Sequence, residues 1–175
     1  MLIAQEKKKN NIAEYVLYMW QIEDLIRANN FDLDSIQRNI INGFQETREM
    51  KEEIRAWYAG LIQMMRKEGI MQDGHLAFVN DVVEQLNKLH EKLKENPEEQ
   101  KYREVYGWAK PNIEIFRNKI TNTGANDIEV CFNALYGLLL LRLKKETVTE
   151  ETTSAMTTFS NLLALLASKY KAAVN

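Results

Sequence analysis

Apolar side chains recur every three or four residues along most of this chain, which is the spacing of one face of an α-helix. In residues 46–68 they stand in alternating steps of four and three, at Met50, Ile54, Trp57, Leu61 and Met64. Residues 74–95 repeat the pattern, at Val79, Val82, Leu86, Leu89 and Leu93. Such stripes predict helices that pack nearly antiparallel in a bundle.

Turn and capping residues predict where the first helices begin and end. One helix is expected over residues 10–29, and a short one over residues 32–42, with Asp32 as its N-cap. The helix over 46–68 should end at Gly69, and the helix over 74–95 at the sequence NPEE. In that sequence Pro97 suits the first position of the next helix.

The fifth predicted helix contains Pro111, which lacks an N–H and whose ring crowds the carbonyl four residues earlier, at Gly107. A kink is expected rather than a break, because an apolar face continues past the proline. This face consists of Tyr102, Val105, Ala109, Ile113, Phe116 and Ile120.

Capping boxes predict the starts of the last two helices. Asn126 is followed three residues later by Glu129, and Thr147 by Glu150. The chain is therefore expected to be all-α, forming a single-domain bundle of six to seven helices over residues 1–175.

The sixth predicted helix, centred on residues 130–143, is the most apolar part of the chain. Its run of about fourteen residues is shorter than the roughly twenty that a membrane span requires, and it contains Asn133 and Arg142. Leucines and aromatic residues occur on nearly every side of it. We therefore expect the central helix of the bundle and no membrane partner.

Composition narrows the class of protein further. The chain has 45% hydrophobic and 27% charged residues, only seven glycines and two prolines, and a net charge of −2. This charge argues against nucleic acid as a partner, because nucleic-acid binding is usually accompanied by a basic excess. The single cysteine, Cys131, lies in the apolar run and predicts a buried thiol in the cytoplasm.

The common catalytic and metal-binding motifs are absent from the sequence. Neither His75 nor His90 has a glutamate three residues before it, as a di-metal carboxylate bundle requires, and both are expected at the surface or its boundary. No phosphate-binding loop, nucleophile elbow or zinc-ligand spacing occurs. We expect no metal, no cofactor and no enzymatic activity.

Three polar residues interrupt apolar faces and are candidates for a buried network or a ligand site. Glu23 lies in the apolar arc of the first helix, where its carboxylate needs a partner such as Arg27 four residues on, or Arg142. Arg142 can alternatively extend to water near a helix C-terminus, and Asn133 can be a core amide. Trp20 and Trp57 are the aromatic residues expected beside a ligand.

Several stretches of sequence resemble an uncharacterised bacterial family, a domain of unknown function of about this length. They are MLIAQEKKKNNIAEYVLYMWQIEDLIRA, EEIRAWYAGLIQMM, EGIMQDGHL and NALYGLLLLRLKKE. The resemblance covers essentially the whole chain. It implies an intact single-domain member, and it assigns no activity and no functional residues.

Two functions are compatible with these patterns. Adjacent aromatics such as Trp57 and Tyr58 cannot both point inward, and the last two helices have wide apolar faces, which favours a helical interaction or scaffold protein that forms a homodimer. The alternative is a small-molecule binding protein, with a pocket between helices in which Arg142 and Asn133 contact a polar or anionic ligand.

Overall fold

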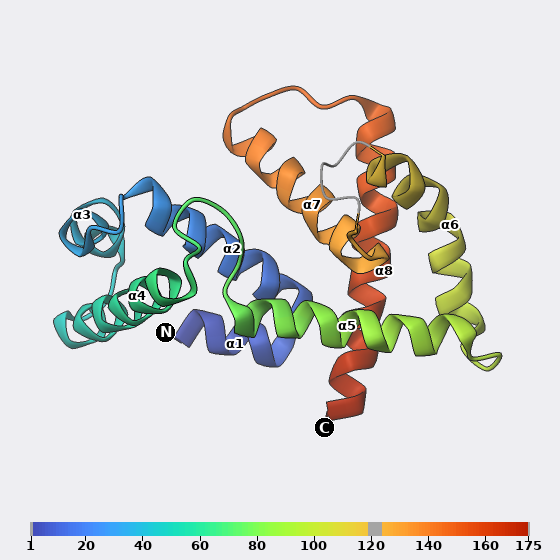
Figure 1. Cartoon of the computed structure of the whole chain (residues 1–175), viewed down its shortest axis with the longest axis horizontal. Coiled ribbons are helices and arrows are strands. Elements are labelled where there is room, and N and C mark those ends of the chain that lie inside the picture. The colour runs from blue at the N-terminus through green and yellow to red at the C-terminus, as the bar shows by residue number, and fades with distance from the viewer. Residues whose placement is uncertain (1, 119–123, 175) are drawn as a thin grey trace. The chain divides into compact units, whose positions relative to one another are not determined.

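The computed structural model describes residues 2–118 and 124–174, and within these ranges it is helical without strands (Figure 1). The elements are α1 (Leu2–Asn10), α2 (Ile12–Ala28), α3 (Leu33–Asn39), η1 (Ile41–Gly43), α4 (Arg48–Glu68), α5 (Ala77–Glu95), α6 (Gln100–Arg117), α7 (Asp127–Leu143) and α8 (Glu150–Val174). The all-α prediction is confirmed. The number of helices was wrong, since the described residues form eight α-helices.

The helix that the sequence pattern missed is α1. Its sequence, LIAQEKKKN, has too few apolar positions to form a stripe, so periodicity gives no signal. Charged side chains hold it instead: Lys7 pairs with Glu14 of α2 at 3.1 Å, and the Lys8 amine lies 5.5 Å from the centre of the Tyr15 ring.

The described residues form two compact units. The first comprises residues 2–9 and 14–81, and the second comprises residues 10–13, 82–118 and 124–174. The prediction of one domain remains a prediction. The candidate sites below each lie within one unit.

In the first unit, capping residues fix the helix ends as predicted. The Asp32 side chain accepts a hydrogen bond from the N–H of Asp34 at the start of α3, and Gly69 ends α4 in the left-handed conformation, with φ +73°. Helix α5 begins at Ala77, three residues later than predicted, because Gly74 also has a positive φ of 85°.

The buried face of α4 shares Ile54 and Leu61 with the predicted face but otherwise has different members. Its members are Ile54, Tyr58, Leu61, Ile62 and Met65. Met64, which the prediction placed in the core, is 38% exposed. Both stripes have helical spacing, so the neighbouring helices decide which one is buried. As expected, only one of the adjacent aromatics points inward: Tyr58 is buried and Trp57 half-buried.

In the second unit, α6, α7 and α8 pack against one another. Helix α6 runs without interruption through Pro111, as predicted, and its ribbon curves in Figure 1. Ile120, the last member of its predicted stripe, lies outside the described residues. Helix α6 begins at Gln100 rather than at Pro97, and α8 is capped by Thr149, which accepts from the N–H of Thr152. The predicted Thr147 capping box is therefore wrong.

The buried residues of helix α7 lie between its start and Leu138, and the helix is exposed from Leu141 onward. It begins at the predicted capping box, in which Asn126 and Glu129 bond each other's backbone N–H groups. The residues buried along it are Ile128, Val130, Cys131, Phe132, Ala134, Tyr136 and Leu138. Beyond these, Leu141 is exposed and Leu143 is 66% exposed, so the apolar run continues past the core that it was predicted to fill.

Candidate functional site

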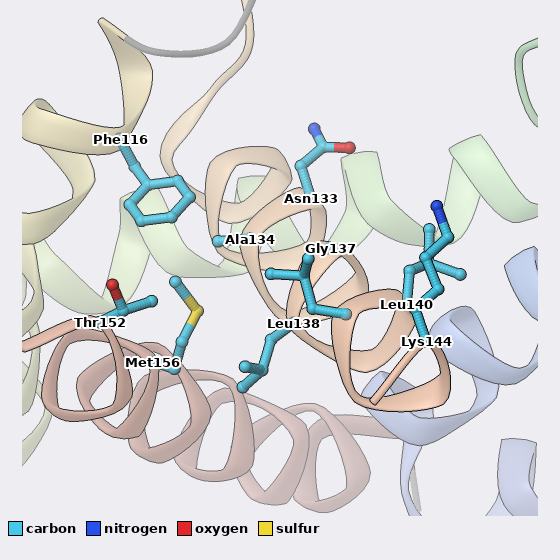
Figure 2. A pocket seen from close by; sticks show the side chains of 10 residues that line it. Phe116, Asn133, Ala134, Gly137, Leu138, Leu140, Lys144, Thr152 and Met156 are labelled. Carbon is cyan, nitrogen blue, oxygen red and sulfur yellow. The ribbon is translucent and has the colours of Figure 1, made fainter. Parts of the chain in front are cut away.

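The second unit contains a mainly apolar pocket of about 350 Å³ (Figure 2). Helices α6, α7 and α8 and the C-cap of α7 contribute its lining: Phe116, Asn133, Ala134, Gly137, Leu138, Leu140, Leu141, Lys144, Thr152 and Met156. Apolar side chains make up most of the wall, with the amide of Asn133, the amine of Lys144 and the hydroxyl of Thr152 as its polar groups. This is the composition of a small-molecule site.

Two features of the sequence keep this pocket open. Gly137 has no side chain, and a Cβ built on it would meet no atom within 4 Å, so the space beside it is empty. On α6, Phe116 packs edge-to-face against buried Phe159 of α8, with ring centres 5.7 Å apart. The Phe116 ring is therefore fixed in position as part of the pocket wall. The missing side chain at Gly137 leaves part of the pocket empty.

The structure places two of the candidate residues at or near this pocket. Asn133 is exposed and lines the pocket, so its interpretation as a core amide was wrong. Arg142 is exposed near the C-terminus of α7, in agreement with the interpretation that it extends to water. Asn133 and Arg142 are both exposed, but they stand nine residues apart, about two and a half turns, and therefore lie on different faces of α7.

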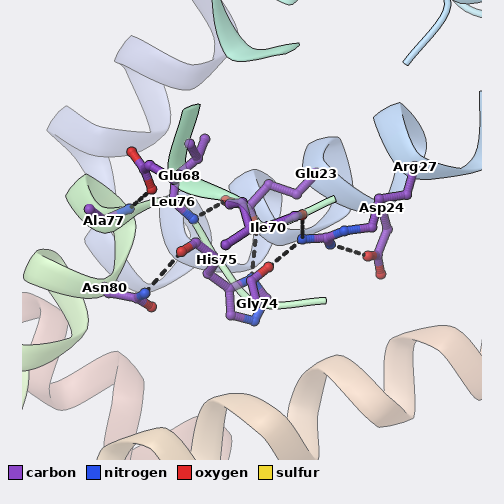
Figure 3. Close-up of polar contacts among 10 residues, drawn as sticks. All are labelled: Glu23, Asp24, Arg27, Glu68, Ile70, Gly74, His75, Leu76, Ala77 and Asn80. Atoms are coloured by element: carbon purple, nitrogen blue, oxygen red, sulfur yellow. Dashed lines mark hydrogen bonds and ion pairs between the residues drawn. The ribbon is translucent and has the colours of Figure 1, made fainter. Parts of the chain in front are cut away.

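Glu23 is fully buried and lies in a separate polar cluster of the first unit (Figure 3). One of its carboxylate oxygens is 2.6 Å from Nδ1 of His75, and the other accepts a hydrogen bond from the N–H of Leu76 at 3.0 Å. The Trp20 ring is stacked on the His75 imidazole, with centres 4.0 Å apart and planes 8° apart. Glu23 therefore has its partners in its own unit.

The expected partner of Glu23, Arg27, binds elsewhere. Its guanidinium donates to Asp24 at 2.8 Å, to the carbonyl of Ile70 at 3.2 Å and to the carbonyl of Gly74. Spacing of four residues on α2 suggested the Glu23 pair, but Arg27 turns to the segment between α4 and α5. The pairing prediction was wrong because that segment offers carbonyl acceptors that a local pattern does not reveal.

Glu23 and Glu68 together cap the N-terminus of α5. Glu23 accepts from the N–H of Leu76, and Glu68 accepts from the N–H of Ala77 at 2.8 Å. Both N–H groups lie at a helix start, where they lack partners within the helix and where the helix dipole favours negative charge. The cluster therefore has a structural role, with Trp20 packed over it, while Trp57 lies half-buried beside Tyr58 and lines neither feature.

A second polar cluster, around His90, was missed by the sequence interpretation. His90 is fully buried, which overturns its predicted position at the surface or its boundary. Its Nδ1 lies 2.8 Å from the hydroxyl of Tyr102, and its Nε2 lies 3.5 Å from a carboxylate oxygen of Asp127. Tyr106 donates to the same carboxylate at 2.7 Å, and Arg117 also pairs with it.

These contacts determine how Asp127 titrates. The nearby His90 imidazole lowers the pKa of Asp127 to about 2, with help from Tyr106 and the charge of Arg117, although partial burial opposes the shift. Burial raises the pKa of both Tyr102 and Tyr106. The only signal in the sequence is that His90 stands four residues after Leu86 and three before Leu93, on the buried stripe.

Comparison with known proteins decides the family. A family model described as a domain of unknown function matches residues 1–175. The chain belongs to the DUF4924 family. The resemblance found in the sequence is thereby confirmed, while the bacterial origin that it implied remains an expectation. Neither a curated protein nor a solved structure matches the chain.

The described part of this DUF4924 chain offers little reactive chemistry at the pocket. The lining residues include no His, Cys, Asp or Glu. Cys131 is fully buried in α7, and burial raises the pKa of its thiol, so the thiolate needed for attack is not formed near neutral pH. Within residues 2–118 and 124–174, no three metal-ligating side chains gather as they would around an ion, and no helix is both long and apolar enough to cross a membrane.

Proposed function

We propose that this protein acts by binding and that the pocket of the second unit takes a small, mainly apolar molecule. The observation that carries the proposal is the pocket itself, whose volume of about 350 Å³ is at the lower end of the range of small-molecule sites. Its wall of leucine, methionine and phenylalanine side chains favours apolar surface, and its few polar groups can orient a ligand. Catalysis is not part of the proposal, because no base and nucleophile meet at this pocket.

A leucine at Gly137 is expected to fill the pocket without unfolding the protein. The side chain would enter space that holds no atom within 4 Å of the added Cβ. The free energy of unfolding should rise by about 0.5–1 kcal/mol, since glycine is a poor helix residue. The neutral fluorescent probe N-phenyl-1-naphthylamine should bind the variant about tenfold more weakly than the wild type, a loss of about 1.4 kcal/mol.

Gly60→Leu is the matched control, because Gly60 also lies within a helix, also has open space around it and belongs to the first unit. It should leave probe affinity unchanged. Equal probe binding by the wild type and Gly137→Leu would overturn the pocket as the binding site.

Self-association is the second candidate function, and a specific surface favours it. On α6, Trp108, Pro111 and Ile115 stand at steps of three and four, on the side opposite buried Ala109 and Ile113. Trp108 is 58% exposed and Ile115 is 54% exposed. Tryptophan is enriched at the centres of protein interfaces, so we propose that this stripe meets the same stripe of a second copy in a homodimer.

Trp108→Lys is expected to shift such a homodimer to monomer, because it places a charge at the centre of an apolar contact. Native mass spectrometry at micromolar concentration would measure the shift. Met71→Lys, at an apolar residue that is exposed in the first unit, should leave the dimer intact. A monomeric wild type would contradict the proposal.

The proposal also places the protein in the cytoplasm, with neither nucleic acid nor membrane as a partner. The support comes from the sequence: one cysteine that has no second cysteine to pair with, and a net charge of −2.

A further inference from the structure

The C-terminal end of α7 carries a cluster of cations next to the pocket. Arg142, Lys144 and Lys145 are all exposed, and only Glu146 among their immediate neighbours is acidic. None of the three cations forms an ion pair with any residue in the described ranges, whereas Arg27 and Arg117 each bind a carboxylate. Positive charge at this end of α7 is therefore available to a ligand.

One of these cations belongs to the pocket itself. Lys144 lines it together with Asn133, and no lining residue is acidic. Figure 2 shows the Asn133 amide and the Lys144 amine pointing to the same side of α7, with Phe116 and Met156 across the pocket from Lys144. Asn133 and Lys144 are about three turns apart along α7, so they do not form one donor group. The pocket thus combines an apolar wall with a charged amine at the C-terminal end of α7.

Building on the proposed function, we propose that the ligand is a single-chain anionic amphiphile, a short hydrocarbon chain ending in a carboxylate. The chain would lie against Phe116, Leu138 and Met156. The carboxylate would accept hydrogen bonds from the Lys144 amine, which supplies N–H donors. A cationic head group is disfavoured, since it would face Lys144 with no acidic residue in the lining to offset the repulsion.

The energetic contribution of the head group is set by the exposure of Lys144. An ion pair at the surface is worth roughly 0.2–1 kcal/mol, which corresponds to an affinity ratio of at most about fivefold. The apolar wall therefore supplies most of the affinity, and the lysine supplies a preference for anions. Salt should weaken this preference, because exposed charges are screened.

Isothermal titration calorimetry of the full chain with decanoate, 1-decanol and decyltrimethylammonium, each as monomer at low salt, tests the inference. Decanoate should bind roughly twofold to fivefold more tightly than decanol, and the cation should bind most weakly. In Lys144→Met the decanoate preference should disappear, since the methionine keeps the apolar stem without the charge. Lys144 uses only its backbone N–H to end α7, so this substitution should leave the helix intact.

The control for this substitution is Lys110→Met, because Lys110 is exposed on α6 and does not line the pocket. It should retain the decanoate preference. Equal affinity of wild-type protein for decanoate and decanol, with both weakened by Gly137→Leu, would contradict the anionic character of the ligand. It would still support the pocket as the binding site. Unchanged binding of all three compounds in Gly137→Leu would overturn the proposed function itself.

Two further outcomes would also count against the inference. A decanoate preference that survives in Lys144→Met would remove Lys144 as the head-group residue. Equally tight binding to vesicles of phosphatidylglycerol, lost in Lys144→Met, would assign the cations to a lipid surface rather than to a single-chain ligand.

Discussion

Replacing Glu23 with alanine is expected to lower the free energy of unfolding by about 3 kcal/mol. The substitution removes a fully buried carboxylate that accepts from the N–H of Leu76 and lies 2.6 Å from His75. The N–H of Leu76 would lose its acceptor, and the side-chain volume would be left empty. Urea denaturation followed by circular dichroism would measure the change.

Two variants make this result specific. Glu23→Gln keeps an oxygen for the N–H of Leu76 and should cost about 1 kcal/mol, the contribution of one weakened hydrogen bond. Asp24→Ala removes the neighbouring carboxylate, which pairs with Arg27 but is 44% exposed, and should cost less than about 1 kcal/mol. If Glu23→Ala and Asp24→Ala had equal effects, the capping role of Glu23 would be wrong.

Asp127 is expected to make the folded protein sensitive to acid. Its pKa is lowered from 3.8 to about 2 in the folded state, first by the nearby His90 imidazole. Above the unfolded pKa the carboxylate is ionised in both states and contributes about 2 kcal/mol of stability. This contribution should be lost as pH falls from about 5 through the folded pKa near 2, since both states are then protonated.

The test is the free energy of unfolding measured from pH 7 to pH 2 in the wild type and in Asp127→Asn. The variant should be about 2 kcal/mol less stable at pH 7 and should lose the part of the acid dependence that Asp127 supplies. Tyr106→Phe removes one donor to the carboxylate and should cost about 1 kcal/mol at pH 7. An acid dependence that Asp127→Asn leaves unchanged would refute this role for Asp127.

The sequence predicts helices well where a stripe and a cap occur together. Asp32, Gly69 and Asn126 each mark a helix end that the structure contains, because their conformational and hydrogen-bonding preferences act locally. Helix α1 lacks a stripe, so it could not be predicted in this way. The buried face of α4 also could not be chosen, because two overlapping stripes that both contain Ile54 and Leu61 are compatible with a helix.

The candidate site was only partly predictable, because the contacts of its residues depend on parts of the chain that are distant in sequence. Burial of Glu23 follows from its apolar arc, but its partner His75 is 52 residues away and depends on the path of the chain after α4. Asn133 was singled out because it interrupts an apolar run. Its position at a pocket rim depends on how α7 and α8 pack. His90 was missed because a histidine on a leucine stripe is equally compatible with the boundary of a core.

The burial of Cys131 provides a signal that distinguishes the second unit from the first. The chain has three tryptophans, of which Trp20 and Trp57 lie in the first unit and Trp108 in the second, so intrinsic fluorescence mixes signals from both. The single thiol belongs to the second unit alone and reacts only when its surroundings open. The rate at which Cys131 is alkylated under native conditions therefore measures how often the surroundings of α7 open locally. This measurement requires no engineered label.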